Sequence, residues 1–399
     1  MNAARVLFGL AAFAVAASLH IYVWRRLVRD PQWSTTVRRT LTACALILAA
    51  AMVTMMSLSR HVEREVVWPL PLLTWSWLGV LFYLLLFTFA ADVGRWSRRL
   101  WARVGGEAPA APQAPAVASE GVSRRVFGQK LAAGLSAATT LGVGVHGFYS
   151  ARGEFYVPET EVKIPRLAPS LEGLRVVLLS DIHIGPTLGG AFIDRIVERT
   201  NSLRPDLVAI TGDLVDGSVA LIGDEVGRLS RLKSRYGTFF STGNHEFYSG
   251  AQAWMTHLER AGVTVLANSR QRVGDDGGTI EVVGIHDLQG ARFAPHFAPD
   301  LATAMTGADP EAATLLLSHQ PRAIGLTDGF DVDLQLAGHT HAGQLWPFGG
   351  LTRLVQPYIQ GLHSHNAATQ IYVSGGTGYW GPPMRVGAPP EIALLHLTG

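Results

Sequence analysis

The chain has 399 residues, of which 48% are hydrophobic and only 16% are charged. Soluble domains usually carry about 25% charged residues, so this composition excludes a disordered chain and favours membrane segments. The single cysteine, Cys44, stands in an apolar run, which excludes both a disulfide framework and a cysteine-based zinc site.

Charge is distributed unevenly along the chain. Residues 1–150 carry 15 Lys and Arg against 6 Asp and Glu, whereas residues 151–399 carry 18 against 25. This asymmetry predicts a basic membrane anchor followed by an acidic, water-soluble domain. The acidic part lacks the clustered Lys and Arg that a phosphate backbone requires, so no nucleic-acid partner is expected.

Three apolar runs near the N-terminus are long enough to cross a bilayer core, which takes about 20 helical residues. They are Leu7–Trp24, Leu41–Leu58 and Val67–Ala91. Arginines cluster after the first and third runs, so we expect those loops to be cytoplasmic and the N-terminus to lie outside. Residues 1–104 are therefore predicted to form a three-helix transmembrane region.

An Ala/Pro-rich cytoplasmic linker is predicted over residues 105–130. It ends in Ser-Arg-Arg-Val-Phe-Gly-Gln-Lys (123–130), which resembles a twin-arginine export signal with its lysine one place late. The alternative is that Arg124 and Arg125 are ordinary cytoplasmic anchors. Residues 131–150 are expected to be a fourth transmembrane segment. The prediction is a multi-pass cell-membrane protein, exported with the twin-arginine machinery as a partner, whose C-terminal domain is extracytoplasmic.

The pattern changes from Leu174 onward to short apolar runs typical of buried strands. Helical patterns, such as Gly190–Ser202 and Gln252–Ala261, lie between several of them. Residues 151–399 are therefore predicted to form an α/β domain that is large enough for a sizeable core. The expected strands are Leu174–Ser180, Leu207–Thr211, Thr238–Ser241, Ile280–Ile285, Thr314–Ser318, Leu334–Ala337, Ile371–Ser374 and Glu391–Leu397.

Acidic, amide and imidazole side chains follow five of these strands at the point where each strand ends. Open α/β sheets place their ligands at such strand ends. Carboxylate and amide oxygens together with imidazole nitrogens suit divalent metals such as Mn, Fe, Zn or Co. The residues are Asp181, His183, Asp213, Asp216, Asn244, His245, His319, His339 and His341.

In chain order, the motifs D-x-H, G-D-x-x-D, G-N-H-E, H and G-H-x-H resemble those of the calcineurin-like metallophosphoesterases. The bacterial membrane-associated subgroup with a leading hydrophobic or twin-arginine segment is the most similar. The resemblance covers about residues 171–399 and does not account for the first three spans. It implies a four-layer αββα sandwich, preceded here by an all-α transmembrane region of about four helices, and a site for two divalent metal ions.

The resemblance also implies a role for each site residue. His245 would stabilise the transition state or protonate the leaving group, and Asp216 would orient His245. The implied ligands are Asp181, His183 and His341 for the first ion, Asp213 as the bridge, and Asn244, His319 and His339 for the second ion.

The function expected from these observations is that of a membrane-anchored, metal-dependent phosphoesterase. It would hydrolyse phosphodiester or pyrophosphate bonds with a water activated by the ions. A lipid-linked or cell-envelope phosphate ester is the favoured substrate. Two alternatives stay open: a phosphodiesterase for soluble diesters, and a non-catalytic metal-dependent sensing or binding module.

Two loops outside these motifs carry further candidates. Arg385, in the Gly375–Pro390 loop, is expected either to bind a substrate phosphate or to form a structural ion pair. The segment Trp346–Leu351, with Leu354 and Val355 beyond it, is either an apolar lip that touches a membrane or lipid tail, or a packed loop. His286 also follows a strand but is expected not to be a ligand.

Overall fold

The computed structural model describes residues 3–58, 69–104 and 123–399. The chain divides into two compact units. The helical unit comprises Met1–Met56 and Leu73–His146, and the sandwich unit comprises Ser57–Leu72 and Gly147–Gly399.

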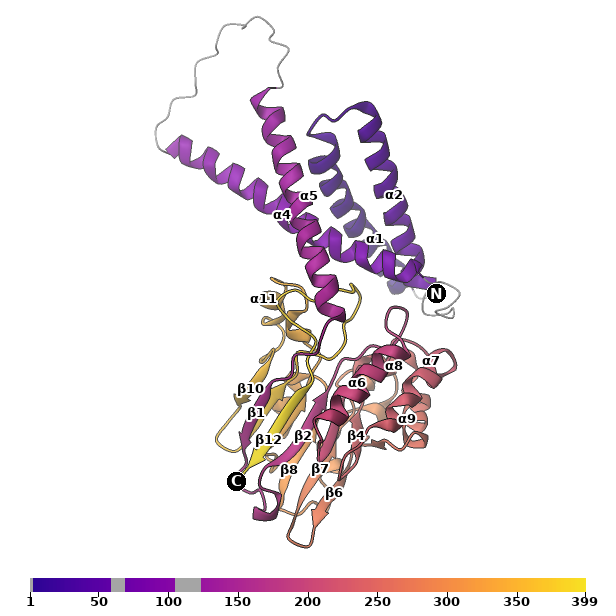
Figure 1. Ribbon diagram of the computed structural model, residues 1–399, viewed down its shortest axis with the longest axis vertical. Coiled ribbons are helices and arrows are strands. Elements are labelled where there is room, and N and C mark those ends of the chain that lie inside the picture. The colour runs from indigo at the N-terminus through magenta and orange to yellow at the C-terminus, as the bar shows by residue number, and fades with distance from the viewer. Residues whose placement is uncertain (1–2, 59–68, 105–122) are drawn as a thin grey trace, which may run out of the picture. The chain divides into compact units, whose positions relative to one another are not determined.

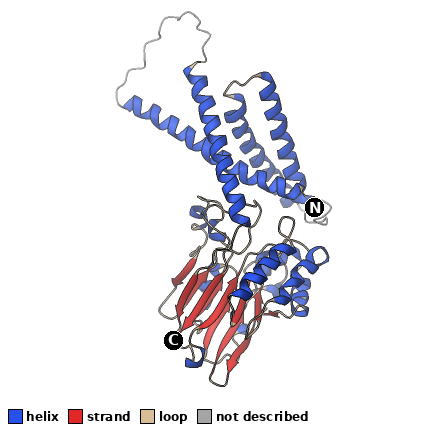
Figure 2. Cartoon of the chain, in the orientation of Figure 1, coloured by secondary structure: helices blue, strands red, loops and turns tan. Residues whose placement is uncertain are grey.

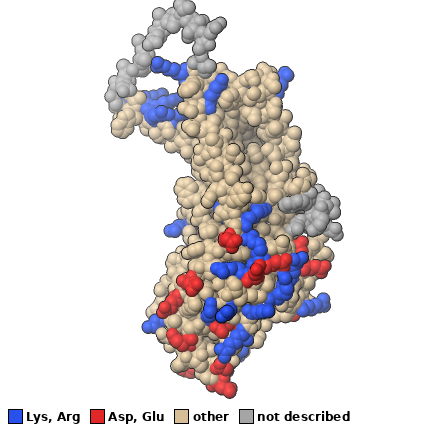
Figure 3. Space-filling view, in the orientation of Figure 1, with Lys and Arg blue, Asp and Glu red and all other residues tan. Residues whose placement is uncertain are grey.

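Long helices make up the helical unit (Figure 2). They are α1 (Ala3–Trp24), α2 (Thr35–Leu58), α4 (Leu70–Val104) and α5 (Arg124–Arg152), with a short π-helix at Arg25–Arg29 after α1. Three described helical stretches are long and apolar enough to cross a membrane: Thr35–Met55, Leu70–Val104 and Arg124–Arg152. In Figure 3 the middle of this unit presents a face with almost no charged side chains.

The predicted spans fall on these helices. Leu7–Trp24 lies within α1, Leu41–Leu58 within α2, and Val67–Ala91 largely within α4, with residues 67 and 68 outside the described residues. Inside the unit, the Trp77 indole donates to His20 Nε2 at 3.2 Å, so His20 of α1 packs against α4.

Helix α5 begins earlier than the sequence predicted. Residues 124–130 were assigned to the linker, but they are the first two turns of α5. Ser123 stands before the helix, and its Oγ accepts from the backbone N–H of Val126 at 3.3 Å, as a capping serine does. The rest of the predicted linker, residues 105–122, lies outside the described residues.

Two six-stranded mixed sheets form the centre of the sandwich unit, counted over its described residues. The first sheet has the order β1-β12-β2-β3-β4-β5 and the second β10-β11-β9-β8-β7-β6. The bounds are β1 Glu159–Lys163, β2 Leu174–Leu179, β3 Leu207–Thr211, β4 Thr238–Ser241, β5 Thr264–Val265, β6 Ser269–Asp275, β7 Gly278–Gly284, β8 Ala313–Leu317, β9 Leu334–Ala337, β10 Gly361–Ser364, β11 Gln370–Val373 and β12 Ala393–Thr398.

Helices cover the outer faces of the two sheets, which gives the four layers that the sequence predicted (Figure 1). Helices α6 (Gly190–Ser202), α7 (Val219–Val226) and α9 (Ala251–Arg260) pack on the first sheet, and the short helix α10 (Leu301–Ala304) packs on the second. Two further short helices, α8 (Asn244–Ser249) and α11 (Gly349–Thr352), follow β4 and β9 in the chain. Strand residues alternate between two cores, as the pleat requires. Val177 and Leu179 of β2 face the helices, whereas Val176 and Leu178 face the second sheet.

Candidate metal centre

The site residues named from the sequence lie at one edge of the sandwich unit, where five strands end. Strands β2, β3 and β4 are parallel neighbours in the first sheet, and β8 and β9 are parallel neighbours in the second. Their carboxyl ends therefore meet at the same edge of each sheet, and the packing of the two sheets brings both edges together.

The backbone of the site is held in an uncommon conformation. Five of the predicted ligand residues have left-handed φ angles: Asp181 (54°), His183 (53°), Asp213 (50°), His339 (70°) and His341 (50°). Non-glycine residues rarely adopt this region, and each instance costs about 1–3 kcal/mol. Such strain persists where the surrounding fold fixes it, and it gathers at functional sites.

Two motif glycines permit the close approach of these loops. A Cβ on Gly338 would stand 1.9 Å from Ser180 Oγ and 2.2 Å from Asp181 Oδ2. A Cβ on Gly243 would stand 2.2 Å from Asp213 Oδ1. The glycines of G-H-x-H and G-N-H-E are therefore required by the space beside the two aspartates.

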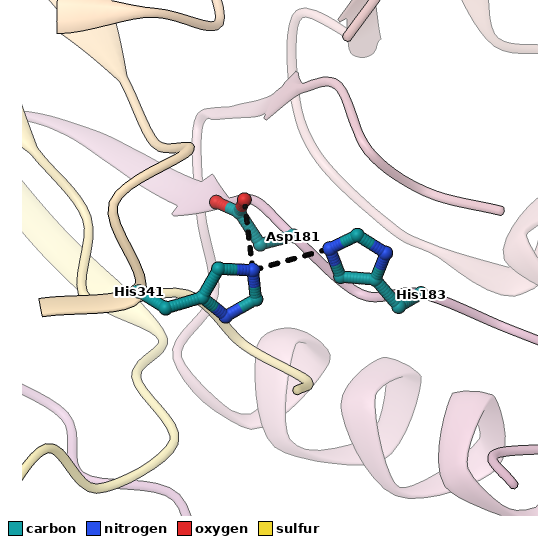
Figure 4. Close-up of side chains that lie close together, drawn as sticks. All are labelled: Asp181, His183 and His341. Atoms are coloured by element: carbon teal, nitrogen blue, oxygen red, sulfur yellow. Dashed lines mark hydrogen bonds and ion pairs between the residues drawn. The ribbon is translucent and has the colours of Figure 1, made fainter. Parts of the chain in front are cut away.

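The first group of donor atoms consists of Asp181, His183 and His341 (Figure 4). His341 Nε2 lies 3.3 Å from Asp181 Oδ1 and 3.1 Å from His183 Nε2. Both oxygens of Asp181 also accept the backbone N–H of His339, at 3.0 and 2.9 Å. The three side chains come from β2 and β9, so this group joins the two sheets.

The second group consists of Asp213, His319 and His339. Asn244 precedes His245, whose backbone N–H donates to Asp213 Oδ1 at 2.8 Å. His319 Nε2 lies 3.1 Å from Asp213 Oδ2 and 3.2 Å from His339 Nδ1. The other nitrogen of His319, Nδ1, donates to the carbonyl of Thr211 at 2.7 Å, which leaves Nε2 to face the group. Asn244 Oδ1 is buried without a hydrogen-bond partner, as an oxygen reserved for a cation would be.

A third set of donor atoms overlaps both groups and includes His245 with His183 and Asp213. His245 Nε2 and His183 Nε2 each lie 3.9 Å from Asp213 Oδ2. Asp216 contacts both rings from behind: its carboxylate accepts from His245 Nδ1 and lies 3.2 Å from His183 Nδ1. Asp216 thus contacts two imidazoles, His245 and His183.

Electrostatics keeps two of the imidazoles neutral. Burial, followed by the charge of Arg385, lowers the pKa of His341 well below its usual value. Burial, followed by His319, lowers the pKa of His339 to about 3. Neutral imidazole is the form that binds metals.

The histidines near Asp213 show the opposite shift. Burial opposes the charge of His245, but Asp213 and Asp216 outweigh it and raise the pKa of His245 to about 9. Burial also opposes the charge of His319, and Asp213 again outweighs it and raises that pKa. Positive charge is therefore stabilised beside Asp213, where a bound cation would replace these protons.

Glu246, for which the sequence predicted no role, holds two loops of the site together. This carboxylate is fully buried, and it accepts the backbone N–H of Gly243, Asp213 and Leu214 at 2.6, 3.0 and 2.8 Å. Burial, followed by Asp213, raises the pKa of Glu246 to about 7. Glu246 therefore ties the loop after β3 to the loop after β4, which fixes Asp213 relative to His245. The only feature of the sequence that pointed to this role was the position of Glu246 as the last residue of the G-N-H-E motif.

Arg385 does not reach a surface where a substrate phosphate could meet it. Its side chain is fully buried, and its guanidinium donates to the carbonyls of Gly375, Gly376 and Gly378 at the base of the site. It also lies 3.2 Å from His341 Nδ1. Arg385 is therefore neither an exposed phosphate ligand nor a partner in an ion pair of the described residues, as the sequence had led us to expect. Its guanidinium instead holds the loop behind His341 through hydrogen bonds to backbone carbonyls.

Aromatic rings border the centre. The Trp380 and Tyr248 rings lie 5.7 and 5.2 Å from the His245 ring. His286 lies outside the donor groups found among the described residues, and its Nδ1 is 3.3 Å from Thr242 Oγ1. Burial, followed by His296, lowers the pKa of His286 to about 4, as expected of a packed histidine.

The fold and the clustered donors are those of a metallophosphoesterase-type domain. Residues 174–343 match the Calcineurin-like phosphoesterase family. Over 258 residues the chain is 41% identical to an uncharacterized metallophosphoesterase of Helicobacter pylori, a match that covers 64% of this chain and 68% of that one.

Two vertebrate relatives carry the same kind of domain. A transmembrane protein with metallophosphoesterase domain from Danio rerio is 34% identical over 389 residues, which covers 94% of this chain and 86% of that one. A protein of the same name from Bos taurus is 38% identical over 274 residues, covering 66% and 62%. The chain belongs to the calcineurin-like metallophosphoesterase family, as its motifs predicted. The Danio rerio match also includes the helical unit, for which the motifs had no counterpart.

Proposed function

We propose that this protein is a membrane-anchored phosphoesterase that hydrolyses phosphodiester or pyrophosphate bonds with two divalent metal ions. The family uses divalent ions, and the described residues include clustered Asp and His side chains that can bind them. The observation that carries the proposal is that Asp213 lies between two donor groups, with its Oδ2 3.9 Å from His183 Nε2 of the first group and 3.1 Å from His319 Nε2 of the second. The buried, unpartnered Asn244 Oδ1 adds a further free donor atom. Carboxylate, amide and imidazole donors without thiolate fit Mn, Fe, Zn or Co.

The two donor groups suggest which side chains bind each ion. The first group, Asp181, His183 and His341, would bind one ion, and His319, His339 and Asn244 would bind the other, with Asp213 between them. Ions held there polarise a phosphoryl group and lower the pKa of water.

The remaining chemistry belongs to the chain itself. In hydrolysis a water gives up a proton to solvent as its oxygen bonds to phosphorus, the bond from phosphorus to the leaving oxygen breaks, and the leaving oxygen takes up a proton. His245 is suited to supply this proton, because Asp216 accepts from its Nδ1 and so supports the charged form of the ring. Asp216 orients the ring through Nδ1, which leaves Nε2 directed toward Asp213 and the donor groups.

The test is hydrolysis of bis-p-nitrophenyl phosphate by the full chain in detergent. We expect hydrolysis in the presence of Mn, Fe, Zn or Co, its loss after treatment with a chelator, and its return when metal is restored. The runner-up is a non-catalytic sensing module. It would be favoured if the protein binds metal but shows no chelator-sensitive hydrolysis with any of these ions.

We further propose that the sandwich unit lies on the extracytoplasmic side of the membrane. Arg124, Arg125 and Lys130 stand at the start of α5, and basic residues favour the cytoplasmic side of a span. A reporter fused after Gly399 tests this orientation. Activity of a reporter that works only in the cytoplasm would contradict it.

Export of this unit by the twin-arginine machinery is a separate proposal. It rests on the match of residues 123–130 to the signal, and the first turns of α5 leave Arg124 and Arg125 exposed. Replacing both with lysine keeps the charge and should block export if the machinery reads the arginine pair. Unchanged export would make them cytoplasmic anchors.

A further inference from the structure

An exposed apolar surface follows the last histidine motif directly. We define the apolar lip as Trp346, Phe348, Leu351, Leu354 and Val355, of which the last three are 59%, 79% and 69% exposed. Single exposed apolar residues are ordinary, but a contiguous set of large ones marks a binding surface. Arg353 is also exposed within this set.

The lip is rooted beside the metal centre. It follows the short helix His341–Gly343, and Gln344 connects it to the Gly375–Pro390 loop. Gln344 Nε2 donates to the carbonyl of Trp380 at 2.9 Å, and its Oε1 accepts the Trp380 N–H at 3.0 Å. The Trp380 ring also lies 5.7 Å from the His245 ring. Trp380 therefore connects the start of the lip with the metal centre.

The same loop is bonded to the end of helix α5. The N–H of Arg385 donates to the carbonyl of Gly147 at 2.9 Å. A Cβ on Gly147 would stand 2.7 Å from Val386 Cγ2, so helix and loop touch closely at this point. Further along, Arg152 donates to the Tyr379 hydroxyl at 2.9 Å. Loop and helix end are therefore held together within the sandwich unit.

The sequence of α5 gives the depth of this contact in a bilayer. Residues 131–151 contain no Asp, Glu, Lys or Arg, and as a helix they span roughly 30 Å, the thickness of a hydrocarbon core. Gly147 falls within the last turns of that stretch, near the boundary on the side of the sandwich unit. Val386 touches α5 there, and its carbonyl accepts the N–H of Trp346 at 2.9 Å. Trp346 thus lies about one strand spacing, ~4.8 Å, from Val386, and Val386 in turn touches the helix near the membrane boundary.

We propose that the apolar lip inserts into the bilayer that α5 crosses, and that the substrate is a lipid whose phosphodiester or pyrophosphate lies at headgroup level. A lipid bilayer is the occupant that this continuity with a membrane-crossing helix favours. Arg353 stands among the apolar side chains, where a cation meets lipid phosphates. The substrate class rests on the proposed function, whereas insertion of the lip does not.

A labelling experiment tests insertion without any activity. Cys44 is the only cysteine, so Cys44→Ser supplies a background in which Leu354→Cys can carry a fluorescent label. Asp276→Cys, at the exposed turn between β6 and β7, is the matched control, because this turn lies at the opposite edge of the second sheet. In lipid nanodiscs, nitroxide-bearing lipids should quench the label at 354 several-fold more than at 276. Equal quenching would overturn insertion, and an apolar but unquenched label at 354 would assign the lip to a protein contact.

A comparison of two kinds of substrate tests the substrate class. The triple variant Leu351→Gln, Leu354→Gln, Val355→Gln should hydrolyse bis-p-nitrophenyl phosphate at the wild-type rate. It should lose about tenfold or more activity on a headgroup-labelled phospholipid or a polyprenyl pyrophosphate in the same nanodisc. A matched triple change to methionine keeps the surface apolar and should keep both activities.

The outcomes separate this inference from the proposed function. A wild-type protein that hydrolyses neither kind of substrate would remove the proposed function, and the substrate class with it, while the labels still decide insertion. Hydrolysis of bis-p-nitrophenyl phosphate without hydrolysis of either lipid would overturn the substrate class alone. An equal loss on all substrates in the glutamine variant would reduce the lip to a structural part of the site.

Discussion

The two donor groups of the metal centre differ in what stands behind their histidines. In the second group, His319 is fixed by a backbone carbonyl, which comes with the fold. In the first group, His341 has the buried guanidinium of Arg385 behind it and His183 has the carboxylate of Asp216. His319 is therefore oriented by main-chain geometry, whereas His341 and His183 are flanked by side chains that single substitutions remove.

Replacing Asp213, which lies between the two groups, should have the largest effect. Asp213→Ala removes the carboxylate between them, so we expect loss of both ions and a fall in hydrolysis of at least about 10⁴-fold, because each ion contributes several kcal/mol. Metal analysis and hydrolysis of bis-p-nitrophenyl phosphate measure the two losses. Asp333→Ala removes a buried carboxylate at the opposite end of β9 and should leave metal content unchanged. Two retained ions in Asp213→Ala would contradict the bridging role.

Replacing His245, which lies near donor atoms of both groups, tests whether it binds metal or acts on the substrate. His245→Ala should lower turnover on the order of 10²-fold or more while both ions stay bound, because a proton donor is lost. His257→Ala removes an imidazole that donates to the Gly223 carbonyl at 2.9 Å, outside the donor groups, and should be neutral for turnover. A lower metal content in His245→Ala would make His245 a ligand, and near-normal turnover would remove it from the mechanism.

Replacing Asp216 tests the difference between the two groups directly. Asp216→Asn weakens the support behind His183, so the ion of the first group should bind roughly 10–100-fold more weakly, while the ion of the second group keeps its affinity. Metal titration of the chelator-treated protein should then show one weakened site and one unchanged site. Asp224→Asn, an exposed change on α7, is the control. Equal weakening of both sites would remove the proposed difference between the groups.

The smallest effect is expected at Glu246, which acts through the backbone of both loops. In Glu246→Gln one carboxylate oxygen becomes an NH₂ group that faces backbone N–H donors, and this mismatch should destabilise the fold by about 1–3 kcal/mol. Thermal unfolding followed by circular dichroism measures it. The exposed Glu198→Gln on α6 should leave the midpoint unchanged, and an unchanged midpoint in Glu246→Gln would show that the loops hold each other without this carboxylate.

The central strands could be predicted from the sequence because they are buried on both faces. Leu207–Thr211, Thr238–Ser241 and Leu334–Ala337 match β3, β4 and β9 to the residue. The edge strands β1 (ETEVK) and β6 (SRQRVGD) were missed, since their polar sequences carry no apolar pattern. Their strand conformation comes from pairing with β12 and β7, which is tertiary information.

The site shows the same division. The motif residues were found because the carboxyl ends of parallel strands must meet at one edge. The positions of Arg385 and Glu246 could not be predicted in this way, because each depends on backbone groups supplied by other segments. Three carbonyls of the Gly375–Pro390 loop accept hydrogen bonds from Arg385. The sequence of that loop has no periodicity from which these bonds could be predicted.

The metal centre takes Asp181 and Asp213 from loops of one sheet and His319 and His339 from loops of the other, so bound ions would cross-link the two sheets at this edge. A ligand that binds only the folded chain stabilises it by about 4 kcal/mol at a thousand times its dissociation constant. Scarcity of transition metals in the surrounding compartment would then shorten the lifetime of this protein against proteases at the same time as it silenced the chemistry.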